Sequence, residues 1–210
     1  MSDVADVRLL FEVDIPDGWH ALPLAETPEN TASAVARIAA VVGVTGEARD
    51  RLIQALSAVS AVAQAPQRGG RTHWAFVPIP DSGRVEALLS LGRIASSAAE
   101  ADEYRDAASV NLDGPDADPK NPAELVNRTV SEHVLPVGRA IAIHDFVIEQ
   151  SPGGVADPAV ERAIVAVFPD RAARGIEMSI VTQNLVWFSD ITGYLVDIAS
   201  TFRETEVRTA

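Results

Sequence analysis

The sequence predicts an α+β fold, in which a mainly antiparallel β-sheet is flanked by helices on both faces. Residues 191–203 carry an apolar stripe with the spacing of a helix that lies on a sheet. The stripe consists of Ile191, Tyr194, Leu195, Ile198 and Phe202. Residues 123–188 contain successive strand patterns with short polar links, which favours an antiparallel meander over βαβ units. Residues 28–65 carry two further helical patterns, and 210 residues accommodate all of these elements in one domain, 1–210.

The first elements along the chain are short strands. Residues 7–13 and 19–24 are rich in apolar residues and flank a turn at 15–18, which contains Pro and Gly. Farther along, residues 72–78 and 84–94 flank the sequence Pro-Asp-Ser-Gly, which is typical of a hairpin turn. We therefore expect two strands before the helical pair and a β-hairpin after it.

The helical pair occupies about residues 28–65. Thr27 and Pro28 form a favourable helix start, and Gly43 ends that helix. Thr45 is placed to cap the second helix. The two apolar faces contain Val35, Ile38 and Val42 in the first helix, and Ala48, Leu52, Leu56, Val59 and Ala63 in the second. Because both helices are rich in small residues, we expect them to pack closely against each other.

The carboxyl-terminal third, about residues 122–206, is a strand meander followed by one helix. The strand patterns are 123–134, 139–149, 161–168 and 175–188. Both faces of 139–149 are apolar, so we expect this strand to lie inside the sheet and to be covered on both sides. Asp190 or the serine before it is placed to cap the final helix. Before this third, residues 98–106 favour a short acidic helix and residues 113–121 favour a loop.

The composition excludes several classes of function. The formal net charge is -13, and an acidic surface repels nucleic-acid backbones and anionic lipid, so we expect neither as a partner. The chain has no cysteine, which excludes disulfides, thiolate metal sites and a cysteine nucleophile. Its amino terminus lacks the pattern of a secretory signal, and its apolar runs are too short to span a membrane. We expect a soluble, cytoplasmic protein.

Two segments resemble the Mog1/PsbP-like superfamily. Residues 15–19 read Ile-Pro-Asp-Gly-Trp, similar to the P-x-G-W turn that opens these domains, and residues 195–203 are similar to their closing helix with its small–Phe/Leu tail. Together with Val-Gly-Arg-Ala at 137–140, they look like an actinobacterial branch whose members mostly have no assigned function. The resemblance implies an α/β/α sandwich and a role in binding or assembly. Some relatives are lipoproteins, but this chain lacks the cysteine that lipid attachment requires.

No group of reactive residues has the spacing of a known catalytic or metal site. The histidines, His20, His73, His133 and His144, are dispersed and form no metal-ligand motif. The acidic residues Asp113, Asp116 and Asp118 share one loop, but their spacing does not fit a calcium-binding EF-hand. The sequence contains neither a phosphate-binding glycine loop nor a nucleophile elbow. We therefore expect no catalytic residues, no cofactor and no metal.

Two functions remain. The first is a non-catalytic protein-binding or assembly module, whose partner is another protein or a second copy of the chain. His73 and Trp74 on the hairpin are its candidate interface residues, since tryptophan is enriched at binding hot spots. The alternative is a small-molecule-binding protein or enzyme with a pocket between sheet and helices. Its candidate polar groups are Arg139, His144 and Gln183.

Overall fold

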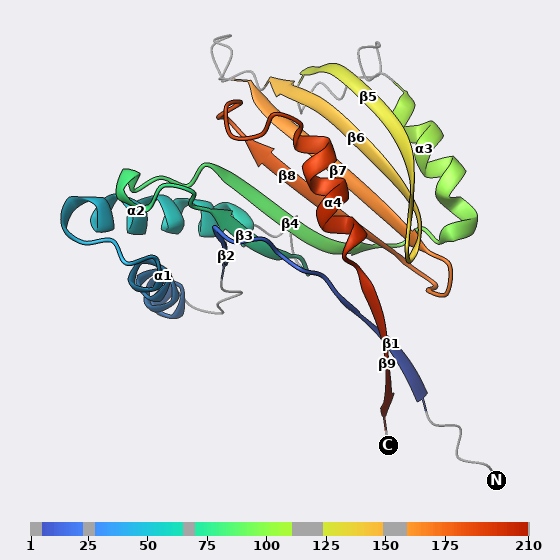
Figure 1. Ribbon diagram of the computed structural model, residues 1–210, viewed down its shortest axis with the longest axis horizontal. Coiled ribbons are helices and arrows are strands. Elements are labelled where there is room, and N and C mark those ends of the chain that lie inside the picture. The colour runs from blue at the N-terminus through green and yellow to red at the C-terminus, as the bar shows by residue number, and fades with distance from the viewer. Residues whose placement is uncertain (1–5, 23–27, 65–69, 111–123, 149–158, 210) are drawn as a thin grey trace.

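The computed structural model describes residues 6–22, 28–64, 70–110, 124–148 and 159–209. A seven-stranded sheet in the order β2-β3-β4-β8-β7-β6-β5 forms its centre, and every neighbouring pair is antiparallel (Figure 1). The strands are β2 (Trp19–Ala21), β3 (Thr72–Phe76), β4 (Ala87–Ile94), β5 (Glu124–Leu135), β6 (Gly138–Ile148), β7 (Val160–Pro169) and β8 (Gly175–Thr182). The predicted α+β class, the antiparallel meander and the β3–β4 hairpin are confirmed.

Four α-helices and two 3₁₀ turns accompany the sheet in the described residues. The helices are α1 (Pro28–Val42), α2 (Gly46–Ala63), α3 (Ala101–Ser109) and α4 (Ile191–Ser200), and the 3₁₀ turns are η2 (Pro80–Ser82) and η3 (Ala98–Glu100). The side chains of α1 and α2 pack with β3 and β4 around Leu52, Leu56 and Ala75, all of them buried. The predicted helical pair and its apolar faces are therefore confirmed.

Strand β6 is covered on both sides, as its two apolar faces predict. Ala140 and Ala142 belong to the same core cluster as α4, whereas Ile141 packs with Ala101 of α3 and Phe168 of β7. Successive side chains of a strand point to opposite faces, so these two core clusters lie on different faces of β6. Because β6 pairs with β5 on one side and β7 on the other, it also lies inside the sheet.

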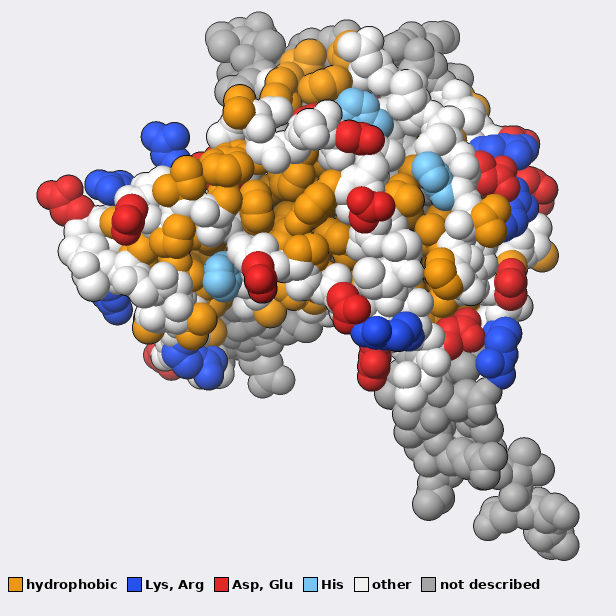
Figure 2. Space-filling view, viewed as in Figure 1, with side chains coloured by type: hydrophobic (Ala, Val, Ile, Leu, Met, Phe, Trp, Pro, Cys, Tyr) orange, Lys and Arg blue, Asp and Glu red, His pale blue; other side chains and the backbone are white. Residues whose placement is uncertain are grey.

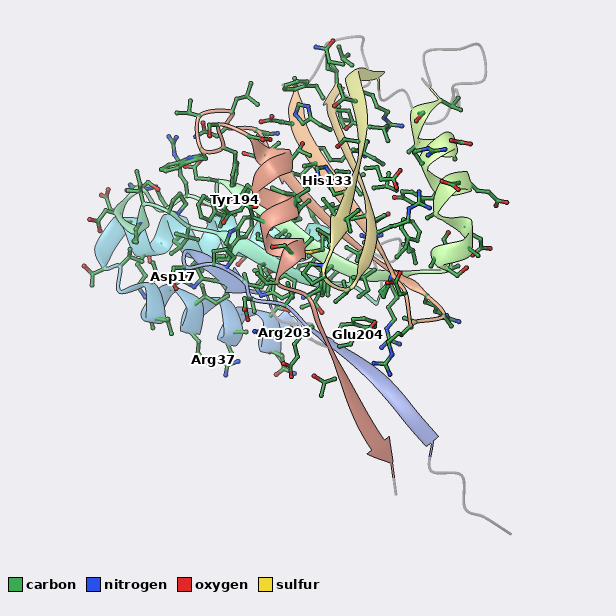
Figure 3. The ribbon with its side chains drawn as sticks, turned by 45° about the vertical axis from the view of Figure 1, so that its right-hand side comes forward. Asp17, Arg37, His133, Tyr194, Arg203 and Glu204 are labelled. Carbon is green, nitrogen blue, oxygen red and sulfur yellow. The ribbon has the colours of Figure 1, made fainter. Side chains whose placement is uncertain are left out.

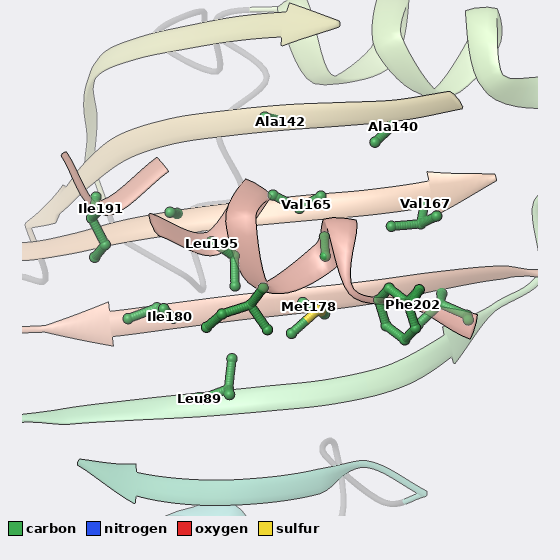
Figure 4. Close-up of a cluster of buried hydrophobic side chains, with 14 of the residues drawn as sticks. Leu89, Ala140, Ala142, Val165, Val167, Met178, Ile180, Ile191, Leu195 and Phe202 are labelled. Atoms are coloured by element: carbon green, nitrogen blue, oxygen red, sulfur yellow. The ribbon is translucent and has the colours of Figure 1, made fainter. Parts of the chain in front are cut away.

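Helix α4 holds the largest core cluster together, and Figure 4 shows its side chains above β7 and β8. Four members of the predicted stripe, Ile191, Leu195, Ile198 and Phe202, are each no more than 3% exposed. The Asp190 carboxylate accepts the Gly193 N–H at 2.8 Å, which confirms the predicted cap. The helix ends at Ser200 rather than at residue 203, and the Thr201 hydroxyl donates to the Ile198 carbonyl at 2.7 Å.

The predicted strand 175–188 is wrong in its second half, because β8 ends at Thr182. The Thr182 hydroxyl donates to the Glu86 carbonyl at 2.7 Å and accepts the Asn184 N–H at 3.0 Å. The Asn184 amide also donates to the Glu86 carboxylate at 2.9 Å. These bonds turn the chain away from the sheet, so residues 183–188 form an irregular link to α4, called here the β8–α4 loop.

A second, two-stranded sheet joins the two ends of the chain. Strand β1 (Asp6–Glu12), which the sequence predicts, pairs antiparallel with β9 (Arg203–Thr209), which it does not. Figure 1 shows this ribbon extending away from the seven-stranded sheet. Near its base, Arg203 pairs with Asp14, and the Asp14 N–H donates to the Thr201 hydroxyl at 2.9 Å. The loop predicted at 113–121 lies outside the described residues.

Candidate functional site

The two candidate interface residues lie on opposite faces of β3. His73 is only 1% exposed, and its Nδ1 lies 2.8 Å from the Ser90 hydroxyl. Trp74 is half-buried against the α4 core cluster. Adjacent strand residues point in opposite directions, so these two side chains do not form one shared patch. Of the pair, Trp74 alone is partly exposed.

The three candidate pocket residues do not meet. His144 and Arg139 are five positions apart on β6, so their side chains point to opposite faces. Arg139 pairs with Glu132 at 2.8 Å and Asp102 at 2.9 Å, whereas the His144 Nε2 lies 2.9 Å from the Glu161 carboxylate. Gln183 is exposed in the β8–α4 loop. A single polar pocket built from these three residues is therefore absent.

The structure instead brings together five aromatic side chains from four separate elements, called here the aromatic cluster. Its members are Trp19 of β2, Phe76 of β3, Trp187 and Phe188 of the β8–α4 loop, and Tyr194 of α4. Phe76 lies at its centre, with ring centroids 4.8 Å from Trp19, 6.1 Å from Trp187 and 5.6 Å from Phe188. The chain has only 11 Phe, Trp and Tyr residues, so almost half of them gather here.

One hydrogen bond fixes the cluster, and one buried donor has no partner among the described residues. The Trp19 Nε1–H donates to the Tyr194 hydroxyl at 2.8 Å, which ties β2 to α4 across 175 residues of sequence. The Trp187 Nε1–H is buried, and no described residue accepts a hydrogen bond from it. Burying a donor without a partner costs free energy, so the packing of Trp187 in the β8–α4 loop must outweigh this cost.

The aromatic cluster continues into an exposed apolar surface. Leu185 is 50% exposed and Val186 is 90% exposed, beside the half-buried Trp187. Figure 2 shows a broad hydrophobic area on this face of the molecule, bordered by several carboxylates. Extended apolar patches of this kind mark surfaces that bind other molecules. We call Leu185, Val186, Trp187 and Phe76 the apolar lip.

Replacing Tyr194 by Phe tests whether its hydroxyl stabilises the cluster. The change leaves the Trp19 Nε1–H without an acceptor, so we expect the free energy of unfolding to fall by about 1–2 kcal/mol in urea unfolding experiments. In a Trp19→Phe background the same change should cost much less, because the donor is already gone. Equal costs in the two backgrounds would show that the hydrogen bond contributes nothing.

The aromatic cluster consists of two indole rings, two phenyl rings and one phenol. Its members include no carboxylate, imidazole or amine, and its one ionisable group is the Tyr194 hydroxyl. Across the described ranges, histidine and acidic side chains nowhere gather in a group of three that would hold a metal ion. Within the same ranges, every helix is too short or too polar to cross a membrane.

Neither a scan of protein-family models nor a search of curated proteins finds a match to the chain.

Proposed function

We propose that the protein is a non-catalytic protein-binding or assembly module that contacts its partner through the apolar lip and the aromatic cluster. The observation that carries this proposal is the 90% exposure of Val186 next to a preassembled aromatic surface. Burial of such side chains against a partner releases water and contributes about 25 cal/mol per Å² of apolar area. Tryptophan beneath an exposed aliphatic residue supplies the rigid contact area that is typical of interface hot spots.

Charge supports a particular kind of partner. The chain carries a net charge of -13, and the hydrophobic area in Figure 2 is bordered by carboxylates and, on its left, also by basic side chains. A second copy of the chain brings the same negative rim, which opposes self-association through this surface. A different protein with an apolar centre and a basic rim complements both features. Binding of that partner weakens as salt screens the rim.

The alternative function, a small-molecule-binding protein or enzyme, has one observation in its favour. His144 and Glu161 form a histidine–carboxylate pair with Nε2 and Oε1 2.9 Å apart. A catalytic site of this type also needs further polar groups that orient the substrate or stabilise developing charge. The neighbouring ring is that of Phe146, 5.3 Å away between centroids, which is an apolar side chain and adds no such group. The binding module is therefore the better supported proposal.

We further propose that the domain is the α/β/α sandwich of the Mog1/PsbP-like superfamily and that it acts in the cytoplasm. The separation of α3 and α4 into core clusters on different faces of β6 supports the sandwich. The turn at residues 15–18 also agrees with the family's opening motif, since Gly18 has a φ of 86°, a left-handed conformation that favours glycine.

Replacing Val186 by Asp tests the proposed surface. We expect affinity purification of the tagged Val186→Asp variant from native cytoplasm to lose the partner that the wild type recovers. Placing a charge at the centre of an apolar contact costs about 2 kcal/mol or more, which weakens binding about thirtyfold. Thermal melting should remain within about 0.5 kcal/mol of wild type, because the side chain is exposed.

Val134 provides a matched control, since it is also an exposed valine, at 88%, but lies on β5. Val134→Asp makes the same chemical change and should keep the partner. If wild type, Val186→Asp and Val134→Asp all recover the same proteins, the proposed surface is wrong. Wild-type protein that elutes alone as a dimer would show self-association instead.

A further inference from the structure

A groove lies between the short edge strand β2 and helix α1, at the opposite edge of the sheet from β5. It has a volume of about 540 Å³ and is lined by all three residues of β2 and by Ala34, Arg37, Ile38 and Val41 of α1. The groove shares Trp19 with the aromatic cluster, but its other lining residues lie outside that cluster. The groove is therefore a separate candidate site.

In the described part of the chain, the backbone of β2 has one edge that pairs with no strand. Toward β3, the Leu22 N–H donates to the His73 carbonyl and the Val77 N–H donates to the Gly18 carbonyl, both at 2.8 Å. In an antiparallel strand, alternate residues bond to alternate sides, so the peptide groups of Trp19 and Ala21 point away from β3. Within the described part of the chain, β3 is the sole strand that pairs with β2. Such an edge is a template for another strand.

The side chains of the groove are suited to an apolar segment with one negative charge. Leu22 and Ala34 are 5% and 6% exposed, and Val41 at 79% exposure leaves an aliphatic rim. Burial lowers the pKa of His20, so its imidazole side chain is uncharged at neutral pH. The exposed Arg37 projects from α1 (Figure 3) and forms no ion pair with any described residue. Among the described residues that line the groove, it is the one charged side chain at neutral pH.

We propose that this groove binds an extended segment of another protein, which adds to the sheet as a strand beside β2. The outward peptide groups of Trp19 and Ala21 hydrogen-bond its backbone, and its apolar side chains lie against α1. A carboxylate on the segment pairs with Arg37. Main-chain bonds supply affinity and the side-chain contacts supply specificity in this mode of recognition. A second copy of this acidic chain is the poorer occupant, because its net charge of -13 repels the first.

The outward N–H of Ala21 allows a sharp test. Proline at an edge position removes this donor without disturbing the bonds to β3, since its missing N–H faced solvent. The probe is a phage-displayed library of random decapeptides, selected against the full-length wild-type chain. We expect the enriched peptides to alternate apolar and other residues and to contain Asp or Glu. They should bind Ala21→Pro about tenfold or more weakly and Ala21→Thr, which keeps the N–H, as tightly as wild type.

Arg37→Glu is the second variant, and it remains informative if proline perturbs β2. We expect it to weaken the acidic peptides and to restore binding when their Asp or Glu is changed to Lys. Val186→Asp should leave peptide binding unchanged, so this test is independent of the apolar lip. The proposal is wrong if the selection enriches no peptide. It is also wrong if the enriched peptides bind Ala21→Pro and Arg37→Glu as tightly as wild type, or if β2 serves only to form a dimer of the chain.

Discussion

Ile198→Asp is expected to yield a protein that is unfolded or aggregated in buffer. Ile198 is 3% exposed and packs from α4 into the main core cluster with Leu195 and Phe202. A buried, unpaired carboxylate costs several kcal/mol, and the lost isoleucine adds a transfer and cavity term of about 2–5 kcal/mol. The sum is comparable to the whole stability of a domain, about 5–15 kcal/mol.

Ser200→Asp is the control for this prediction, because Ser200 is an exposed residue of the same helix. The new charge there meets the weak field at the helix end, and the change removes the hydrogen bond from the Ser200 hydroxyl to the Asp197 carbonyl, so we expect a cost of about 1 kcal/mol. Circular dichroism and thermal melting compare the two variants. A cooperative transition of Ile198→Asp at the wild-type temperature would show that α4 is not needed for the fold.

The elements that the sequence predicts correctly have a periodic pattern of their own. Helix α4 follows from its apolar stripe, and β6 follows from two apolar faces on one segment. The sequence predicts strand β8 too long because residues 185–188 are apolar. The strand ends at Thr182, whose hydroxyl bonds to Glu86, and this contact is about 100 residues away in sequence. Strand β9 has charged and polar residues on both faces, and its pairing with β1 is non-local.

The candidate sites are beyond sequence reasoning for the same reason. Trp19, Phe76 and Trp187 lie far apart in the chain, and no local pattern indicates that their rings meet. The free edge of β2 follows from the strand order of the whole sheet rather than from its three residues.

A buried ion cluster on β6 is the clearest group that the sequence does not indicate. Asp145 is fully buried and accepts hydrogen bonds from Arg128 of β5 at 2.6 Å and Arg162 of β7 at 2.8 Å. Arg128 stands at a β-bulge beside Asn127, which has a left-handed φ of 55°. Bulges redirect side chains. Arg128 also donates to the Ala108 carbonyl at 3.4 Å, which links β5 to the end of α3.

Replacing Asp145 by Asn is expected to lower the free energy of unfolding by about 3–5 kcal/mol, because it leaves two partly buried guanidinium groups without a counter-charge. Asp102→Asn provides the control. Asp102 pairs with Arg139 at 2.9 Å, but its side chain is 62% exposed, so solvent screens the pair. Its loss should cost no more than about 1 kcal/mol. Urea unfolding at neutral pH measures both variants, and equal costs would show that burial adds nothing to the Asp145 pair.

Acid should remove the difference between wild type and Asp145→Asn. Burial by itself raises the pKa of Asp145, but the hydrogen bonds and charges of Arg162 and Arg128 outweigh it and hold the pKa below the ordinary 3.8. A carboxylate with a lowered folded pKa contributes its full stability above the ordinary value, and the contribution is lost as the pH falls through the folded pKa. The stability gap between the two proteins should therefore be constant above about pH 5 and narrow below about pH 4. The amide of the Asp145→Asn variant does not titrate in this range. If the difference in free energy of unfolding between the two proteins stays constant down to about pH 2, other carboxylates cause the acid sensitivity of the wild type.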